Sequence, residues 1–86
     1  TLLPYYRPGD PQMGEGVRGL AGRRSAVVLA NHGPVVASKD LEAAVFAIEE
    51  LEETARLALI LRGADARLLS REQIDDVVTT FEVEWD

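Results

Sequence analysis

One histidine, His32, lies between two apolar runs in the stretch AVVLANHGPVVAS, which covers residues 26–38. An imidazole can bind a metal ion, transfer a proton, or hydrogen-bond to the backbone of a turn. The chain contains no cysteine and no second histidine that could serve as further ligands. Because one imidazole cannot hold a transition metal without other ligands, the residue alone favours a structural role and leaves the chemical roles open.

The neighbours of His32 predict a turn. Gly33 permits a tight backbone turn, and Pro34 restricts its conformation. Asn31 either hydrogen-bonds a ligand or satisfies the backbone of the turn, as asparagine commonly does. The role of Asn31 and Gly33 is therefore expected to be support of the turn beside His32.

Two short strands must flank this turn. Residues 26–31 form a continuous β-rich apolar run, which predicts a strand buried on both faces. The run resumes at residues 35–38, and such close strands indicate a hairpin or a bulged corner. His32 is thus expected at the rim of a sheet.

Three helices are expected around these strands. The first starts at Asp10-Pro11 and runs to about Leu20. The second and most regular spans residues 40–62, where apolar residues recur at helical spacing. The third covers residues 71–81 and starts from a capping box, Ser70-Arg-Glu-Gln.

The ends of the chain carry its aromatic residues. Residues 1–9 are expected to be extended, because prolines disfavour helix in the residue before them. Tyr5, Tyr6 and Arg7 are expected to form an amphipathic loop that packs on its own domain, with a phosphate or subunit surface as the alternative. The tail, residues 82–86, is ambiguous, and an exposed Trp85 would indicate an absent partner surface.

Composition excludes several classes of protein. Nine basic and fifteen acidic residues give a net charge of −6, and no basic stripe is present, so nucleic-acid binding is not expected. No apolar run is long enough to span a membrane. The absence of cysteine fits a cytoplasmic location. With 47% hydrophobic residues, the 86 residues suit a globular domain or part of one.

The segment LANHGPVVASKDLEAAVFAIEELEETARLALILRG, residues 29–63, resembles the C-terminal half of the class II aldolase and adducin family. The family pattern is an apolar strand, a His-Gly turn, a second strand and a long helix with Leu-Glu-x-x-Ala, which Leu51–Ala55 match. The resemblance implies that residues 1–86 are the C-terminal part of a single domain. The implied fold is a three-layer α/β/α arrangement around a central, mainly antiparallel sheet.

The same resemblance implies a site and an assembly. His32 would be one ligand of a divalent metal, most often zinc, and a His-x-His pair earlier in the chain would supply others. The assembly would be a homotetramer with sites between subunits, and the catalytic acid and base stay unassigned. This chain by itself is expected to be inactive.

The stretch LPYYRPGDP, together with the segment from Ala26 to Gly63, is similar to family members that decarboxylate a 3-oxo-tetronate 4-phosphate to dihydroxyacetone phosphate and CO2. The implied function is a metal-dependent carbon-carbon lyase that acts on a sugar-acid phosphate. Two alternatives within the family are a sugar-phosphate aldolase or pentulose-phosphate 4-epimerase and a non-catalytic, adducin-like interaction module. A third alternative, a complete metal-free helical interaction module, would leave two strands with unpaired edges.

Overall fold

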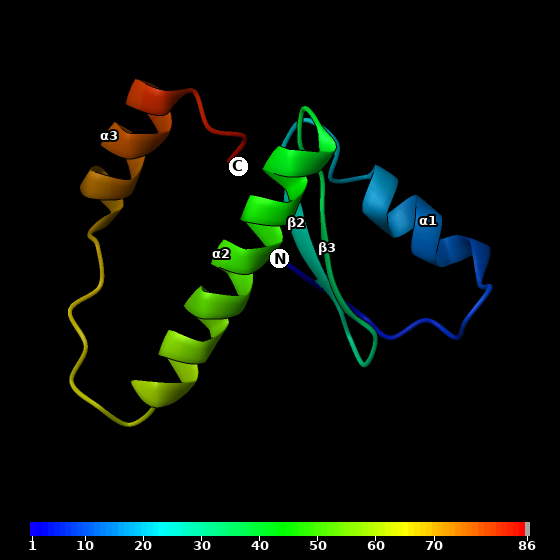
Figure 1. Cartoon of the computed structure of the whole chain (residues 1–86), viewed down its shortest axis with the longest axis horizontal. Helices are drawn as coiled ribbons and strands as arrows, with labels where there is room; N and C mark the ends of the chain where they lie inside the picture. Colours follow the sequence, from blue (N-terminus) through cyan, green and yellow to red (C-terminus); the bar gives the residue numbers. More distant parts are fainter. Residues whose placement is uncertain (86) are drawn as a thin grey trace.

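A small sheet between helices forms the centre of the chain, and a computed structural model describes residues 1–85. The elements follow one another as β1 (Leu2–Leu3), α1 (Pro11–Arg18), β2 (Ala26–Leu29), β3 (Gly33–Val36), α2 (Leu41–Ile60) and α3 (Arg71–Phe81). The α/β class expected from the sequence is confirmed. Helices α1 and α3 lie at opposite ends of the molecule, with the strands and α2 between them (Figure 1).

The sheet has the order β1-β2-β3, with β1 parallel and β3 antiparallel to β2. The predicted hairpin is confirmed, but β2 ends at Leu29 because the next three residues form the turn. The second strand begins at Gly33 rather than Val35, so Pro34 lies inside it, opposite Val28.

Pro34 fits in β3 because of the hydrogen-bond alternation along an antiparallel pair. The amide of Ala37 donates to the carbonyl of Ser25 at 2.8 Å, so the hydrogen-bonded pairs continue at every second position from there. The Pro34 position falls between them, where no N–H is needed for the ladder. The prolyl ring therefore does not interrupt the strand.

The sheet is buried on one face only, so the prediction of a strand buried on both faces is wrong. Val27 and Leu29 of β2 are buried, at 5% and 8% exposure, whereas Val28 between them is 39% exposed. Successive side chains of a strand alternate between faces. Helix α1 covers the Leu29 face through Leu3, which pairs with Leu29 and lies against Gly16.

Helix α1 has the predicted start and an earlier end. The Asp10 carboxylate accepts a hydrogen bond from the amide of Gln12 at 2.9 Å, and Pro11 is the first helical residue. The helix ends at Arg18, two residues before the predicted Leu20. Gly19 follows it, and the amides of the next two residues bond to carbonyls three residues back, which tightens the chain into turns.

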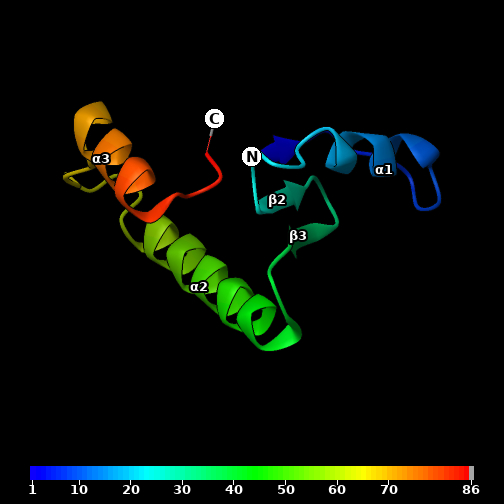
Figure 2. The ribbon, with the colours of Figure 1, turned by 90° about the horizontal axis from the view of Figure 1, so that it is seen from above.

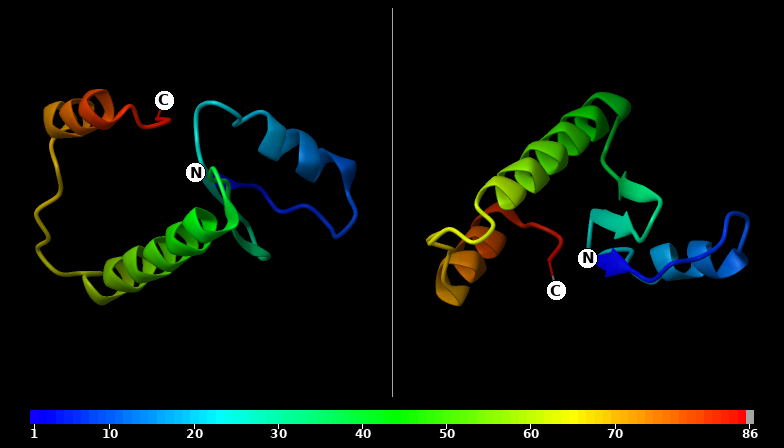
Figure 3. Two further views of the ribbon diagram at one scale, coloured as in Figure 1. Left: turned by 45° about the horizontal axis from the view of Figure 1, so that its top comes forward. Right: turned by 90° about the horizontal axis from the view of Figure 1, so that it is seen from below.

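Helices α2 and α3 agree with the predictions within two residues. The Asp40 carboxylate caps α2 by accepting from the amide of Ala43 at 2.8 Å. Both halves of the predicted capping box are formed at α3, where the Ser70 hydroxyl accepts from the Gln73 amide and the Gln73 side chain accepts from the Ser70 amide. The segment between the two helices, residues 61–70, is exposed throughout and forms a wide loop (Figure 3).

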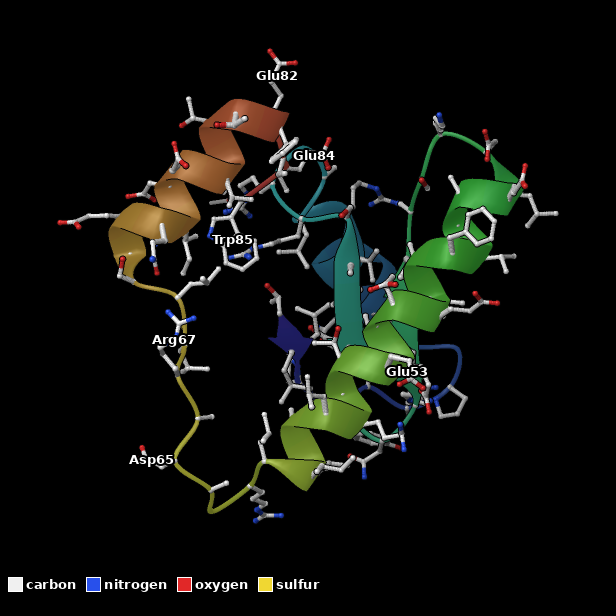
Figure 4. All side chains as sticks on the ribbon, turned by 60° about the vertical axis from the view of Figure 1, so that its left-hand side comes forward. Glu53, Asp65, Arg67, Glu82, Glu84 and Trp85 are labelled. Atoms are coloured by element: carbon white, nitrogen blue, oxygen red, sulfur yellow. The ribbon has the colours of Figure 1, made fainter. Side chains whose placement is uncertain are left out.

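The tail connects α3 to the entrance of β2. Trp85 forms an isolated antiparallel bridge with Arg24, whose guanidinium carbon lies 3.9 Å from the centre of the indole ring. Figure 4 shows Trp85 between α3 and the strands, with Asp65 and Arg67 on the loop below. Trp85 is 47% exposed, so the tail is ordered against Arg24 while one side of the ring faces solvent.

The molecule is open rather than tightly packed. Its accessible surface is 7064 Å², whereas a compact monomer of this mass exposes about 5000 Å². Its radius of gyration is 14.6 Å, against about 12 Å for a compact domain of the same length. The view from above shows why, since α2 and α3 extend away from the strands (Figure 2).

Candidate metal-ligand site at the hairpin turn

The three residues that the sequence singled out lie together at the end of the hairpin, with Asn31 and His32 in the turn and Gly33 as the first residue of β3. The amide of His32 donates to the carbonyl of Leu29 at 3.0 Å, which closes the turn. Asn31 has φ 65° and Gly33 has φ 131°, so both adopt backbone conformations that most residues avoid. Asparagine tolerates the left-handed region better than other non-glycine residues, which explains its place before His32.

The His32 side chain is exposed at the rim of the sheet, as predicted. Its Nε2 lies 2.6 Å from the carbonyl oxygen of Tyr6 and donates a hydrogen bond to it. The ring also stacks on Tyr5, with centroids 5.6 Å apart and planes 4° from parallel. The geometry is an offset aromatic stack, which fixes the tilt of the imidazole.

The sequence did not predict that Tyr5 and Tyr6 lie beside His32. The expectation for these residues was a loop that packs on its own domain, and Tyr6 does pack there, with its hydroxyl against Gly16 of α1. Tyr5 instead is 57% exposed and covers His32. This contact depends on the parallel pairing of β1 with β2. Strand β1 has only two residues, which are too few to show a strand pattern in the sequence.

The parallel register explains how the segments meet. Leu3 pairs with Leu29, and the amide of Ala30 donates to the Leu3 carbonyl at 3.2 Å. The two chains leave these paired residues in the same direction. Tyr5 and Tyr6 therefore run alongside the turn that carries His32.

The donor set of the described residues does not form a complete metal site. His32 offers one imidazole, and no group of three or more His, Cys, Asp or Glu side chains that could hold a metal occurs within residues 1–85. Zinc sites in proteins use three or four protein ligands. This part of the chain therefore supplies one ligand nitrogen at most.

Comparison with known proteins settles the family. The model of the class II aldolase and adducin N-terminal domain matches residues 1–59, which include β1, α1, the hairpin and nearly all of α2. The chain belongs to the class II aldolase and adducin family. Helix α3 and the loop before it lie outside the matched residues.

Similar members of the family share one curated name. A 3-oxo-tetronate 4-phosphate decarboxylase from Pectobacterium atrosepticum is 50% identical over 88% of this chain and 35% of its own length. The protein of that name from Escherichia coli strain K12 is 45% identical over 88% of this chain and 36% of its own length. This chain therefore spans about a third of the length of these relatives.

A solved structure shares the fold. The crystal structure of YgbL from Klebsiella pneumoniae matches with a TM-score of 0.82 and 45% identity, over 87% of this chain and 36% of that one. YgbL from Escherichia coli matches with a TM-score of 0.81 at the same identity and coverage. The arrangement of strands and helices described above is thus that of a class II aldolase-like protein. The described residues include no helix that is long and apolar enough to cross a bilayer.

Proposed function

We propose that the whole protein containing this chain is a metal-dependent carbon-carbon lyase that decarboxylates a 3-oxo-tetronate 4-phosphate to dihydroxyacetone phosphate and CO2. The observation that supports the reaction is 50% identity over 88% of the chain to a relative of that name. An aldolase or epimerase that acts on a sugar phosphate is the alternative of the same family.

His32 is proposed as one ligand of the metal. Its position supports this, since the ring lies exposed at a turn where its Nε2 is already bonded and its Nδ1 has a lone pair to offer. The remaining ligands would come from residues outside this chain, with a His-x-His pair as the expected source. A divalent ion bound there, most simply zinc, would supply Lewis-acid stabilisation of the negative charge that develops as the bond breaks.

The wider architecture is also proposed. This chain would be the C-terminal part of one three-layer domain, and the exposed faces of its sheet and of α2 support a further layer packed on them. A homotetramer in the cytoplasm is the proposed assembly and location. Native mass spectrometry of the whole protein would test the assembly, and a monomer at working concentration would contradict it.

The test of the reaction is product formation by the purified whole protein. With a divalent metal supplied, we expect CO2 and dihydroxyacetone phosphate from 3-oxo-tetronate 4-phosphate, and chelation should abolish both. A protein that binds metal and cleaves or epimerises a sugar phosphate without releasing CO2 would instead support the alternative function, that of an aldolase or epimerase. A whole protein without a His-x-His pair and without bound metal would favour an adducin-like, non-catalytic module.

A further inference from the structure

Helix α2 carries residues at the spacing of a helix-pairing seam. Their separations alternate between four and three residues, which is the pattern of the positions that meet when two helices pack along their length. Together they form the α2 seam, whose members in chain order are Leu41, Val45, Ile48, Glu52, Ala55 and Leu59. All of them are apolar except Glu52, which lies near the middle.

Strand β3 covers only the first half of this helix. Helix α2 packs on β3, and its half-buried residues end at Leu51. Residues 52–60 are all exposed, and Val45 and Leu59 of the seam are 43% and 68% exposed. Figure 2 shows the second half of α2 extending away from the strands. Within residues 1–85, the second half of the α2 seam therefore has no cover.

Helix α3 does not cover the α2 seam, because its apolar side chains face the tail. They line a groove that is formed by Leu69, Ile74, Val77, Val78, Val83 and Trp85. The basic residue of α3, Arg71, pairs with Asp75 of the same helix at 3.0 Å. The cover of the α2 seam must therefore come from elsewhere.

A second copy of α2 is a poor partner because of Glu52. In a parallel pair of α2 helices, each Glu52 would face its own copy, which places two negative charges together. In an antiparallel pair that overlaps along most of the seam, Glu52 would face Ile48 or Ala55, which offer a carboxylate no partner. Burying an unpaired charge is costly. The residue opposite Glu52 should therefore be a cation.

The surroundings of Glu52 also favour a cation. Glu52 lines one shallow hollow together with Ile48, Glu49 and Glu53. Arg56, one turn further along, pairs with Glu53 at 3.4 Å. An incoming Lys or Arg would thus meet the Glu52 carboxylate beside two more acidic residues.

We propose that the α2 seam is the docking surface for an amphipathic helix of the same polypeptide, which packs apolar residues on the seam and places a Lys or Arg against Glu52. A polar residue at one seam position sets the register of two packed helices, and Glu52 has that role here. About two thirds of the length of each curated relative lies outside the match, which leaves room for such a helix. The proposal rests on the chain being part of a longer protein and not on the reaction of that protein.

The first experiment measures whether the seam is covered in the whole protein, with its other cysteines replaced by serine. Leu59→Cys places a thiol on the seam, and Glu53→Cys is the control, since Leu59 and the Glu53 side chain are each 68% exposed in this chain. We expect the seam thiol to react with a maleimide at least about tenfold more slowly, because a covered thiol reacts only through local opening. Ala55→Cys, a smaller change on the seam, should be slow as well.

Two results of this experiment would overturn the proposal. Equal rates for the seam and control thiols would mean that the α2 seam is uncovered in the whole protein. A slow seam rate that becomes fast on dilution to monomers would mean that a second subunit supplies the cover.

The second experiment tests the cation opposite Glu52 by the thermal midpoint of the whole protein. Glu52→Leu should lower the midpoint by about 5 °C or more, because it leaves a covered cation without its partner. The matched control Glu53→Leu should change it by about 2 °C or less, since Glu53 makes only an exposed ion pair. Leucine and glutamate have similar helix propensity, so the helix itself is not the cause.

A higher midpoint in Glu52→Leu would overturn the proposed cation, because it would show that apolar groups face this position. Neither experiment uses substrate or metal. A whole protein that releases no CO2 would contradict the proposed function, and the α2 seam would still be tested by both measurements.

Discussion

At the scale of single residues, the chemistry of this chain is concentrated in one imidazole and its immediate contacts. His32 is exposed, stacks on one tyrosine and donates to the backbone of the next. Loss of this side chain removes no buried apolar contact, because Val27 and Leu29 form the buried core. The effects of substitution on function and on stability should therefore be separable at this position.

Replacing His32 by alanine in the whole protein should lower metal occupancy while leaving the fold largely intact. Surface substitutions away from packing and caps change stability by about 0.5 kcal/mol or less. Metal content by elemental analysis and the thermal midpoint by circular dichroism measure the two effects. Unchanged metal affinity in His32→Ala would return His32 to a purely structural role.

Replacing Gly33 by alanine should destabilise the hairpin by about 1–3 kcal/mol, the cost of placing a side chain at a backbone conformation reserved for glycine. Its φ is 131°, and no atom lies within 4 Å of the Cβ position, so conformation and not crowding is the cause. Urea unfolding of the whole protein measures the change. Gly14→Ala is the control and should be neutral or slightly stabilising, because alanine favours a helix interior.

At the scale of elements, the local signals in the sequence were sufficient for most of the fold. Asp40 and the Ser70–Gln73 box mark helix starts by the bonds their side chains make, and those bonds are present. The hairpin followed from the Gly33-Pro34 interruption. These features depend on residues within four positions of one another, so the sequence shows them directly.

The features that the sequence did not reveal depend on contacts between distant residues. Strand β1 is only two residues long, and its parallel partner lies 26 positions later. The position of Tyr5 and Tyr6 beside His32 follows from that pairing and from the close approach at Gly16. The one-sided burial of β2 likewise depends on which elements cover the sheet, which periodicity does not specify.

Replacing Ser70 by alanine should weaken the first turn of α3 by about 1 kcal/mol, because the amide of Gln73 loses its acceptor. Amide hydrogen exchange of residues 71–75 in the whole protein should show faster exchange there. Thr79→Ala, in the exposed second half of α3, serves as the control, since it removes a hydroxyl far from the cap. Equal exchange in the two variants would argue against a stabilising capping box.

At the scale of the whole molecule, the dominant feature is apolar surface that these elements leave uncovered. Helix α2 has no buried residue, and large apolar side chains at both of its ends are exposed, with Leu41 at 81%. A helix with apolar residues around its circumference is typical of a protein interior. The apolar residues that suit α2 to a protein interior therefore form an exposed surface in this chain, and such a surface favours association in water.

The 86-residue chain expressed alone should therefore self-associate. Contiguous apolar patches larger than several hundred Å² are rare on soluble monomers, and the accessible surface of 7064 Å² exceeds the compact expectation by about 2000 Å². Sedimentation velocity over a concentration series should show species heavier than 9.4 kDa. A monodisperse monomer that binds no apolar dye would contradict this prediction.

The bridge between Trp85 and Arg24 gives the chain an optical reporter. Trp85 is the only tryptophan among these 86 residues, and a guanidinium lies over its ring. The emission wavelength and yield of an indole respond to an adjacent cation and to exposure to water. In a protein whose other tryptophans are replaced by phenylalanine, fluorescence would follow the detachment of the C-terminal tail from the start of β2. Stopped-flow traces could then time that detachment separately from the melting of α2, which circular dichroism follows.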